Sequence, residues 1–261
     1  MIVDTNVSLS RWPFRRLPDD EPAALVARLR RHGVVQAWAG SFDGILHRDL
    51  AGVNARLASE CRAYGDGLLL PFGSVNPRLP DWREDLRRCH EEHRMTGIRL
   101  HPNYHGYDLR DPGFAEVLSL AAARGLVVEL ALRMEDERTQ HPLVRVAPVD
   151  PAPLPVLIGR EPKLRLVILH WKDLLRGDLI RRLSAAGEVY FEISTLDGLG
   201  NFTRLLEDVS VERVLFGSNF PLFNFESALF KAREAGLSEA QRKAVFEGNA
   251  RRLPGRGRTR V

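Results

Sequence analysis

The stretch Val214–Pro221 reads Val-Leu-Phe-Gly-Ser-Asn-Phe-Pro. Its apolar first half predicts a short buried strand, which runs directly into a polar tip at Ser218 and Asn219. An apolar run that ends in Gly, a polar pair and Pro is typical of a parallel barrel, whose strands deliver side chains to the barrel mouth. Asn219 is a neutral amide where a carboxylate would serve metal or acid–base chemistry. We therefore interpret this tip as part of a functional rim whose chemistry has been altered.

Eight short apolar runs occur along the 261 residues, and segments of helical periodicity separate most of them. This alternation predicts an α/β fold, a single (β/α)8 TIM barrel, in one domain over residues 1–261. A doubly wound open sheet is the alternative, disfavoured because no Gly-x-Gly-x-x-Gly turn follows the first run. The expected strands are Met1–Thr5, Val34–Ala39, Gly67–Gly73, Gly97–Leu100, Leu126–Leu132, Leu164–Leu169, Val189–Ile193 and Val214–Gly217. The expected helices are Pro22–His32, Leu50–Tyr64, Trp82–His93, Pro112–Arg124, Leu179–Ala186 and Phe223–Ala235.

Composition limits the partners of the chain. The net charge is only +4, and the densest basic cluster is a tail over about 251–261, which we interpret as a flexible, solvated terminus rather than a nucleic-acid site. No apolar run is long enough to cross a membrane. Cys61 and Cys89 are isolated, and the first strand begins at once, so we expect a reducing, cytoplasmic setting. The sequence does not show whether the barrel forms a homodimer.

Side chains alternate along a strand, so the parity of each run predicts which residues point into the barrel. In Leu164–Leu169 this places Val167 and Leu169 outside and the next residue, His170, inside. Arg99 and Glu129 fall inside on neighbouring strands, so we expect an ion pair between them. The inward polar residues are expected to be Asp4, Asn6, Arg99, His101, Glu129, His170, Glu192 and Asn219. Burying so many polar groups is costly, which favours a ligand site at the strand ends over a satisfied polar core.

Four segments resemble the amidohydrolase superfamily, within it the amidohydrolase-related group of decarboxylases and hydrolases that act on small carboxylated substrates. They are Ile2–Ser8, Gly97–Pro102, Leu166–His170 and Leu215–Pro221. The family pattern is Asp-x-His-x-His on strand one, His near the ends of strands five and six, and Asp in a Gly-Ser-Asp-x-Pro turn on strand eight. The resemblance implies a TIM barrel with its site at the strand ends.

The departures from that pattern fall on metal positions. The resemblance places Asn6 and Ser8 at the two strand-one histidines and Asn219 at the strand-eight aspartate, and only His170 is carried over. Asn and Ser are weak ligands, so the usual binuclear or mononuclear metal site is not expected, and neither is a cofactor. The alternative is one divalent ion, Zn or Mn, at a rearranged site of His101, His141 and His170.

We therefore expect a hydrolase of a small carboxylated substrate, such as a lactone or an amide. His170 would activate water, His101 and Asn219 would stabilise the oxyanion, and Asp4 would hold these groups in position. The alternatives are a degenerate, non-catalytic barrel that binds a metabolite, and a metal-dependent hydrolase or decarboxylase with a rearranged site. The expected substrate-binding residues are Arg99, Arg133, Glu129, Asn6, His141 and Trp171. Of these, His141 lies in the long irregular stretch 134–155, which we expect to fold over the mouth.

Overall fold

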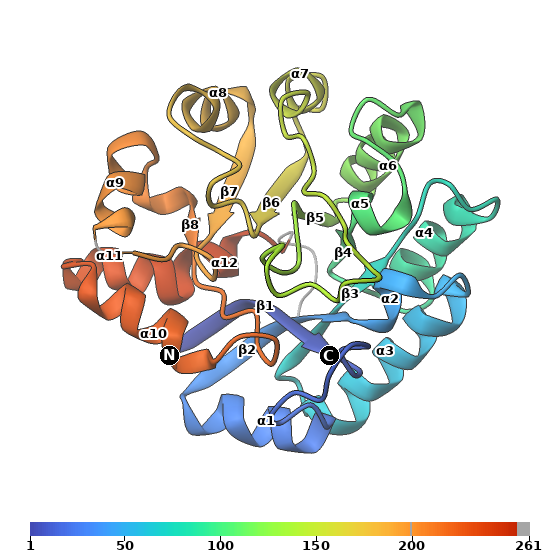
Figure 1. Cartoon of the computed structure of the whole chain (residues 1–261), viewed down its shortest axis with the longest axis horizontal. Coiled ribbons are helices and arrows are strands. Elements are labelled where there is room, and N and C mark those ends of the chain that lie inside the picture. The colour runs from blue at the N-terminus through green and yellow to red at the C-terminus, as the bar shows by residue number, and fades with distance from the viewer. Residues whose placement is uncertain (199, 255–261) are drawn as a thin grey trace.

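In the computed structural model, which describes residues 1–198 and 200–254, eight parallel strands form one sheet in chain order, as Figure 1 shows. The sheet closes between β8 and β1, where the Thr5 and Ser8 N–H groups donate to the carbonyls of Phe216 and Phe220, both at 3.0 Å. The predicted TIM barrel is thus confirmed. The strands are β1 (Ile2–Leu9), β2 (Val34–Ser41), β3 (Leu69–Ser74), β4 (Gly97–Leu100), β5 (Val127–Ala131), β6 (Arg165–Leu169), β7 (Glu188–Glu192) and β8 (Val214–Leu215).

Helices surround the barrel, and the six predicted ones begin and end within two residues of their expected bounds. Pro22 and Pro112 open α1 and α6 in the first turn, where a missing N–H is harmless. The helices are α1 (Pro22–Arg31), α2 (Asp43–Leu46), α3 (Leu50–Gly65), α4 (Trp82–Glu91), α5 (Pro102–His105), α6 (Pro112–Ala123), α7 (Leu154–Gly159), α8 (Asp178–Ala186), α9 (Asn201–Asp208), α10 (Phe225–Glu234), α11 (Glu239–Lys243) and α12 (Asn249–Arg252). A 3-10 turn (Val211–Arg213) and a π turn (Ala244–Gly248) complete the set.

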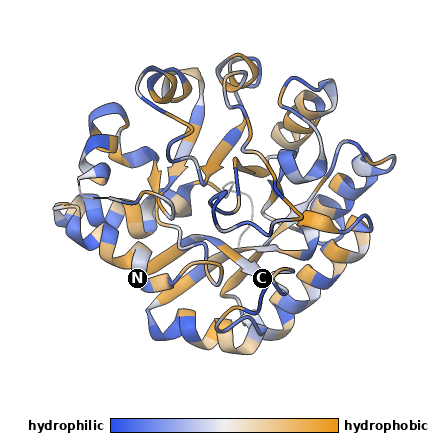
Figure 2. Cartoon of the chain, viewed as in Figure 1, coloured by the Kyte–Doolittle hydropathy of each residue, from blue (hydrophilic) through white to orange (hydrophobic). Residues whose placement is uncertain are grey.

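Two apolar clusters separate the outside of the sheet from its interior. Ile98, Leu100 and Phe191 belong to the outer cluster, which packs against the helices as predicted. Trp38 and Phe72 belong to the inner one, where their rings stack with centroids 4.9 Å apart. Figure 2 shows hydrophobic positions on the strands at the centre and many hydrophilic positions on the surrounding helices. The apolar inner layer fills the barrel below the mouth, so it supports the polar side chains above it.

The parity prediction for strand six was wrong. Val167 and Leu169 lie in the inner cluster, and Leu166 and Ile168 lie in the outer one. His170 nevertheless turns into the barrel because its backbone is left-handed, with φ of 54°. A left-handed residue breaks the alternation of the strand, so parity counted backwards from His170 assigned the whole strand to the wrong faces.

The lower end of the barrel is closed by the chain's last described segment. Arg165, at the start of β6, donates to the carbonyls of Gly125 and Leu253. Leu253 is buried in the inner cluster, directly after α12. The predicted basic tail therefore begins within a helix, at Arg251, and its residues 255–261 lie outside the described residues.

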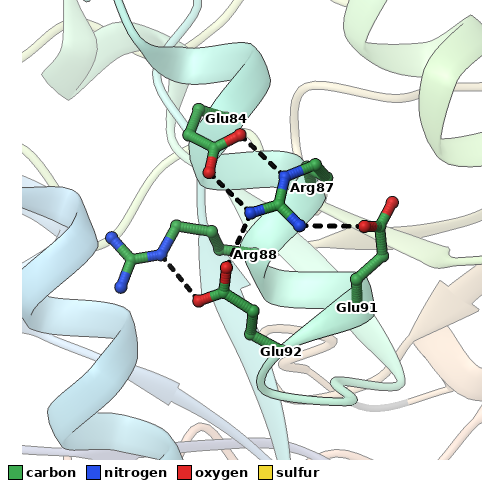
Figure 3. A network of polar contacts seen from close by, with 5 residues as sticks. All are labelled: Glu84, Arg87, Arg88, Glu91 and Glu92. Carbon is green, nitrogen blue, oxygen red and sulfur yellow. Dashed lines mark hydrogen bonds and ion pairs between the residues drawn. The ribbon is translucent and has the colours of Figure 1, made fainter.

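Helix α4 carries a network of ion pairs on its solvent face, drawn in Figure 3. Arg87 contacts Glu84, Glu91 and Glu92 at 2.6–2.9 Å, and Arg88 contacts Glu92 at 2.9 Å. These side chains are about one-third to one-half exposed, so solvent screens the pairs and each contributes little to stability. The network stabilises the helix and lies away from the barrel mouth. No helix in residues 1–198 and 200–254 is long and apolar enough to cross a membrane.

Candidate active site at the barrel mouth

All eight polar residues predicted to point inward are buried, and none is more than 3% exposed. They come from β1, β4, β5 and β7, from the residues that directly follow β4 and β6, and from the tip a few residues after β8. These positions lie toward the carboxyl ends of the strands, where TIM barrels hold their active sites. The eight are Asp4, Asn6, Arg99, His101, Glu129, His170, Glu192 and Asn219.

The predicted ion pair between Arg99 and Glu129 is present, with Nε and Oε2 2.6 Å apart. The other guanidinium nitrogens of Arg99 donate to the Val7 carbonyl at 3.0 Å, the Ser8 hydroxyl at 3.2 Å and the Trp38 carbonyl at 3.3 Å. Both nitrogens of the fork are therefore used within the protein. Arg99 holds Glu129 and ties β4 to β1 and β2, and it is not free to bind a substrate carboxylate as predicted.

A chain of hydrogen bonds fixes the protonation state of His170. Its Nδ1 lies 2.6 Å from the carbonyl of Arg133, which can only accept, so Nδ1 carries the proton. Its Nε2 is then an acceptor for the side-chain amide of Asn6 at 2.9 Å. The same Asn6 nitrogen donates to Glu192 Oε2 at 3.3 Å. His170 is therefore a neutral imidazole whose free lone pair is occupied by an amide N–H.

Asp4 joins the first strand to the last one. Its Oδ1 accepts from the N–H groups of Asn6 and Ser218, both at 3.0 Å, and its Oδ2 accepts from the Ser218 hydroxyl at 2.5 Å. The next residue, Asn219, is left-handed at φ 55°. Asn tolerates this conformation better than most residues, so the Asp4–Ser218 contacts hold the tip that presents the Asn219 amide.

Burial shifts the pKa values of the site toward the neutral forms. Desolvation raises the pKa of Asp4 to about 6, against hydrogen bonds from Ser218 and Asn6 that lower it. Desolvation likewise raises the pKa of Glu129 to about 7, opposed by Arg99, and the pKa of Glu192 to about 7, opposed by Ser194. The pKa of His170 is lowered to about 4, again chiefly by desolvation. Three carboxyl groups thus titrate close to neutral pH at one site, which is characteristic of functional sites.

Several buried polar atoms at the mouth have no hydrogen-bond partner. Both amide atoms of Asn219 are unpaired, although this amide acts on the pKa of His170. The others are Asn6 Oδ1, His101 Nδ1, Glu129 Oε1 and Trp12 Nε1. An orphaned buried polar atom costs about 1–3 kcal/mol, and native structures contain few of them. Their concentration here indicates a position for water or a ligand.

The loop Leu132–Pro153 covers the mouth, and in Figure 1 this yellow-green segment crosses the centre of the barrel. Glu135 accepts from Arg15 at 2.5 Å, and the Ala147 carbonyl accepts from Asn103 at 3.0 Å. The ring of His141 stacks on Phe14, with centroids 5.9 Å apart. The loop is therefore tied to the segments after β1 and β4. This lid explains why the site residues are buried.

Not every residue predicted to bind substrate lies among the buried polar residues at the mouth. His141 is exposed and contacts the lid's neighbour Phe14. The side chain of Arg133 points to Asp173 at 3.9 Å and lines a cavity of about 200 Å³ beneath the lid, with Glu135, Glu137 and the paired Asp136 and Arg138. Trp171 is buried, and its Nε1 donates to the Glu192 carbonyl at 2.7 Å.

Two serines in the site lay outside the predicted site residues. Ser194 donates to Glu192 through its hydroxyl at 2.8 Å, and Ser218 donates to Asp4. Ser194 lies two residues after Glu192, on the same face of the extended chain, and Ser218 precedes Asn219. Ser218 belongs to the polar tip already interpreted as part of a functional rim, whereas for Ser194 the spacing from Glu192 was the signal, because a serine becomes informative once its acceptor is known.

The chain matches the family model described as amidohydrolase over residues 10–256. It belongs to the amidohydrolase family. A comparison with curated proteins gave no match.

Solved structures of amidohydrolase-like barrels share the fold at low sequence identity. The 5-carboxyvanillate decarboxylase of Sphingomonas paucimobilis is 16% identical, with a TM-score of 0.73, covering 97% of this chain and 98% of that one. A dihydroxybenzoic acid decarboxylase of a Polaromonas species, with bound manganese and the inhibitor 2-nitroresorcinol, is 16% identical, with a TM-score of 0.69 over 90% and 86%. The 4-oxalomesaconate hydratase of Rhodopseudomonas palustris is 14% identical, with a TM-score of 0.66 over 97% and 95%.

The Polaromonas protein holds a divalent metal, manganese, whereas we expected no cofactor for this chain. The donors of this chain do not fit one. The free lone pair of His170 is taken by Asn6, and both carboxylate oxygens of Asp4 and of Glu192 accept hydrogen bonds. Among the described residues no three His, Cys, Asp or Glu side chains form a group that could hold a metal ion. The alternative site of His101, His141 and His170 therefore does not assemble.

Proposed function

We propose that this amidohydrolase-family chain is an enzyme that hydrolyses a small carboxylated substrate, such as a lactone or an amide, by acid–base chemistry of its own side chains. The observation that carries the proposal is the contact between His170 and Asn6. The side-chain amide nitrogen of Asn6 lies 2.9 Å from Nε2 of His170 and donates to the lone pair that a metal ion would need. The unpaired atoms at the mouth supply the remaining contacts for a ligand.

Glu129 is better suited than His170 to be the general base. Protonating His170 at neutral pH would cost about 4 kcal/mol, because its pKa is lowered to about 4. The pKa of Glu129 is raised to about 7, near the value at which a general base works best, and its Oε1 is unpaired. Glu129 would remove a proton from the attacking water and return it to the leaving group, while Arg99 holds the carboxyl in place.

The oxyanion that forms on the substrate carbonyl would be stabilised by Asn219. Its Nδ2 is an unpaired donor in a dry site, where such a contact is stronger than in water. His101 is a second candidate, since burial keeps its pKa well below the usual range and its imidazole neutral.

The test is turnover of a panel of small carboxylated lactones and amides by protein purified with and without a chelator. We expect hydrolysis in both preparations. Glu129→Gln should lower kcat by about 10²–10⁴ and remove the limb of the pH–rate profile near pH 7. Asn219→Ala should lower kcat by about 10²–10³.

Two results would contradict this proposal. Hydrolysis or decarboxylation that appears only when Zn or Mn is added would favour a metal-dependent enzyme with a rearranged site. Unchanged turnover in Glu129→Gln would remove the proposed base. The exposed Glu116, which pairs with Arg83 on the helix surface, provides a matched Glu→Gln control that should keep full activity.

A non-catalytic metabolite-binding barrel is the second candidate, and the internal hydrogen bonding favours it. Asp4, Asn6 and Glu192 each use side-chain atoms on one another or on Ser194 and Ser218, as in a satisfied polar core. This candidate expects ligands of the panel to bind with no turnover above background.

We further propose a cytoplasmic setting and a homodimer as the assembly to test. Cys61 and Cys89 are buried free thiols, which suits a reducing compartment. Sedimentation analysis of the purified chain would distinguish monomer from dimer.

A further inference from the structure

A second cavity lies outside the mouth, between α8 and α9. Its volume is about 310 Å³, within the range of small-molecule sites. It is bounded by the segment that follows β6, by Leu196 after β7 and by the first turns of α9. Its lining does not include Glu129, His170, Asn6 or Asn219. It is thus separate from the site already described.

The floor of this cavity is apolar. Trp171 and Leu175 come from the segment after β6, Ile180 comes from α8, and Leu205 comes from α9. All four are buried, with at most 6% of their surface exposed. An apolar floor of this kind accepts a hydrocarbon ring or a branched chain, and such contacts carry much of the affinity of small ligands.

The rim carries unbalanced positive charge. Lys172, Arg176 and Arg204 line it, against Asp173 and Asp208. Asp208 is already paired with Arg181 at 2.7 Å.

The individual cations are also poorly neutralised. Lys172 donates only to the Asp197 carbonyl, which does not neutralise its charge. Arg176 lies 3.9 Å from Asp173, at the limit of an ion pair. The guanidinium of Arg204 has no hydrogen bond or ion pair to any residue within 1–198 and 200–254. A free guanidinium above an apolar floor matches a carboxylate on an apolar body.

The segment that walls the cavity holds strained backbone. Asp173 is a non-glycine residue in the left-handed region, at φ 68°. Strain of this kind persists where surrounding contacts fix it, and it occurs often at ligand clamps. The wall also touches the mouth, because Trp171 donates to the carbonyl of Glu192.

We propose that the cavity between α8 and α9 is a second binding site, for a small amphipathic monocarboxylate. The apolar body of the ligand lies on Trp171 and Leu205, and its carboxylate meets Arg204 and Lys172.

The experiment is a calorimetric titration of the whole chain with benzoate, benzamide and inorganic phosphate. Benzoate should bind saturably, in about the millimolar range or tighter, while benzamide and phosphate should each bind at least about ten-fold more weakly. The double variant Arg204→Gln/Lys172→Gln should weaken benzoate binding about ten-fold or more. Arg160→Gln, an exposed arginine at the end of α7, is the matched control and should bind like the parent.

Each other outcome overturns the site. Phosphate that binds as well as benzoate would show that the apolar floor contributes nothing. Benzoate binding unchanged in Arg204→Gln/Lys172→Gln would show that benzoate binds elsewhere. A titration of Glu129→Gln would then show whether that other location is the mouth. Absence of saturable binding up to about 20 mM would show that there is no such site. Circular dichroism of the variants, whose changed residue Arg204 is exposed, checks that they fold.

Discussion

At the scale of single residues, the mouth depends on small residues placed beside buried charged ones. A Cβ on Gly217 would lie 2.4 Å from Glu192 Oε1 and 2.5 Å from its Cγ. A Cβ on Gly40 would lie 2.7 Å from Arg99 Nη1. Glu192 and Arg99 cannot move aside, because hydrogen bonds hold both. These two glycines therefore make room for the charged groups of the site.

Gly217→Ala should destabilise the protein by about 1–3 kcal/mol, because the added methyl group overpacks the Glu192 carboxylate. Gly159→Ala is the control. Gly159 ends α7, and a Cβ there meets nothing within 4 Å, so alanine should be neutral or stabilise by up to about 1 kcal/mol. Urea denaturation of the two variants measures the difference. Equal stability of both would show that the Gly217 site relaxes freely.

Much of the ring of buried polar residues was predictable from strand parity, including the Arg99–Glu129 ion pair. Parity assigned the residues of β6 to the wrong faces, because the left-handed backbone of His170 reverses the alternation and the sequence does not reveal that conformation. The amide of Asn6 could be identified as a departure from the family pattern. Its position on the His170 lone pair could not, since a hydrogen bond depends on orientations that no spacing encodes.

At the scale of elements, helical periodicity predicted six helices well, while the lid was recognisable only by its length. The Leu132–Pro153 loop holds its own shape through Gln140, whose side chain bonds both the N–H and the carbonyl of Val146. The lid is attached to Arg15 and Asn103, which lie far away in the sequence, so no local sequence pattern predicts these contacts. The short helices α2 and α5 were also not predicted, because four residues carry no measurable period.

The lid should open locally when its two tethers are removed. Glu135→Gln with Asn103→Ala takes away an ion pair with a buried carboxylate and a hydrogen bond, together about 2 kcal/mol. Cleavage within residues 136–147 by a non-specific protease should then accelerate about ten-fold or more, with little change in Tm. The control is Arg83→Ala, which breaks an exposed ion pair with Glu116, outside the lid, and should leave cleavage unchanged. Cleavage unaffected by the double variant would show that other contacts hold the lid.

At the scale of the whole molecule, the buried titratable groups set how stability depends on pH. The pKa values of Asp4, Glu129 and Glu192 are raised to about 6, 7 and 7. The contribution of these protonated carboxyl groups to the free energy of unfolding is therefore complete at low pH and is lost as pH rises through those values. Burial lowers the pKa of His101 and His170, so the histidines act in the opposite sense and cost stability as pH falls below about 6.5. The two effects oppose each other below that pH, and above it only the carboxyl groups remain.

Because three carboxyl groups oppose two histidines, the stability of the parent chain should fall from pH 5 to pH 8. Glu129→Gln removes one ionisation, so its free energy of unfolding relative to the parent should rise by about 2–3 kcal/mol from pH 5 to pH 8. The histidines are common to both proteins and cancel in this difference. Chemical denaturation at a series of pH values provides the measurement. A difference that is flat with pH would mean that Glu129 ionises normally, which would also remove the reason for assigning it as the general base.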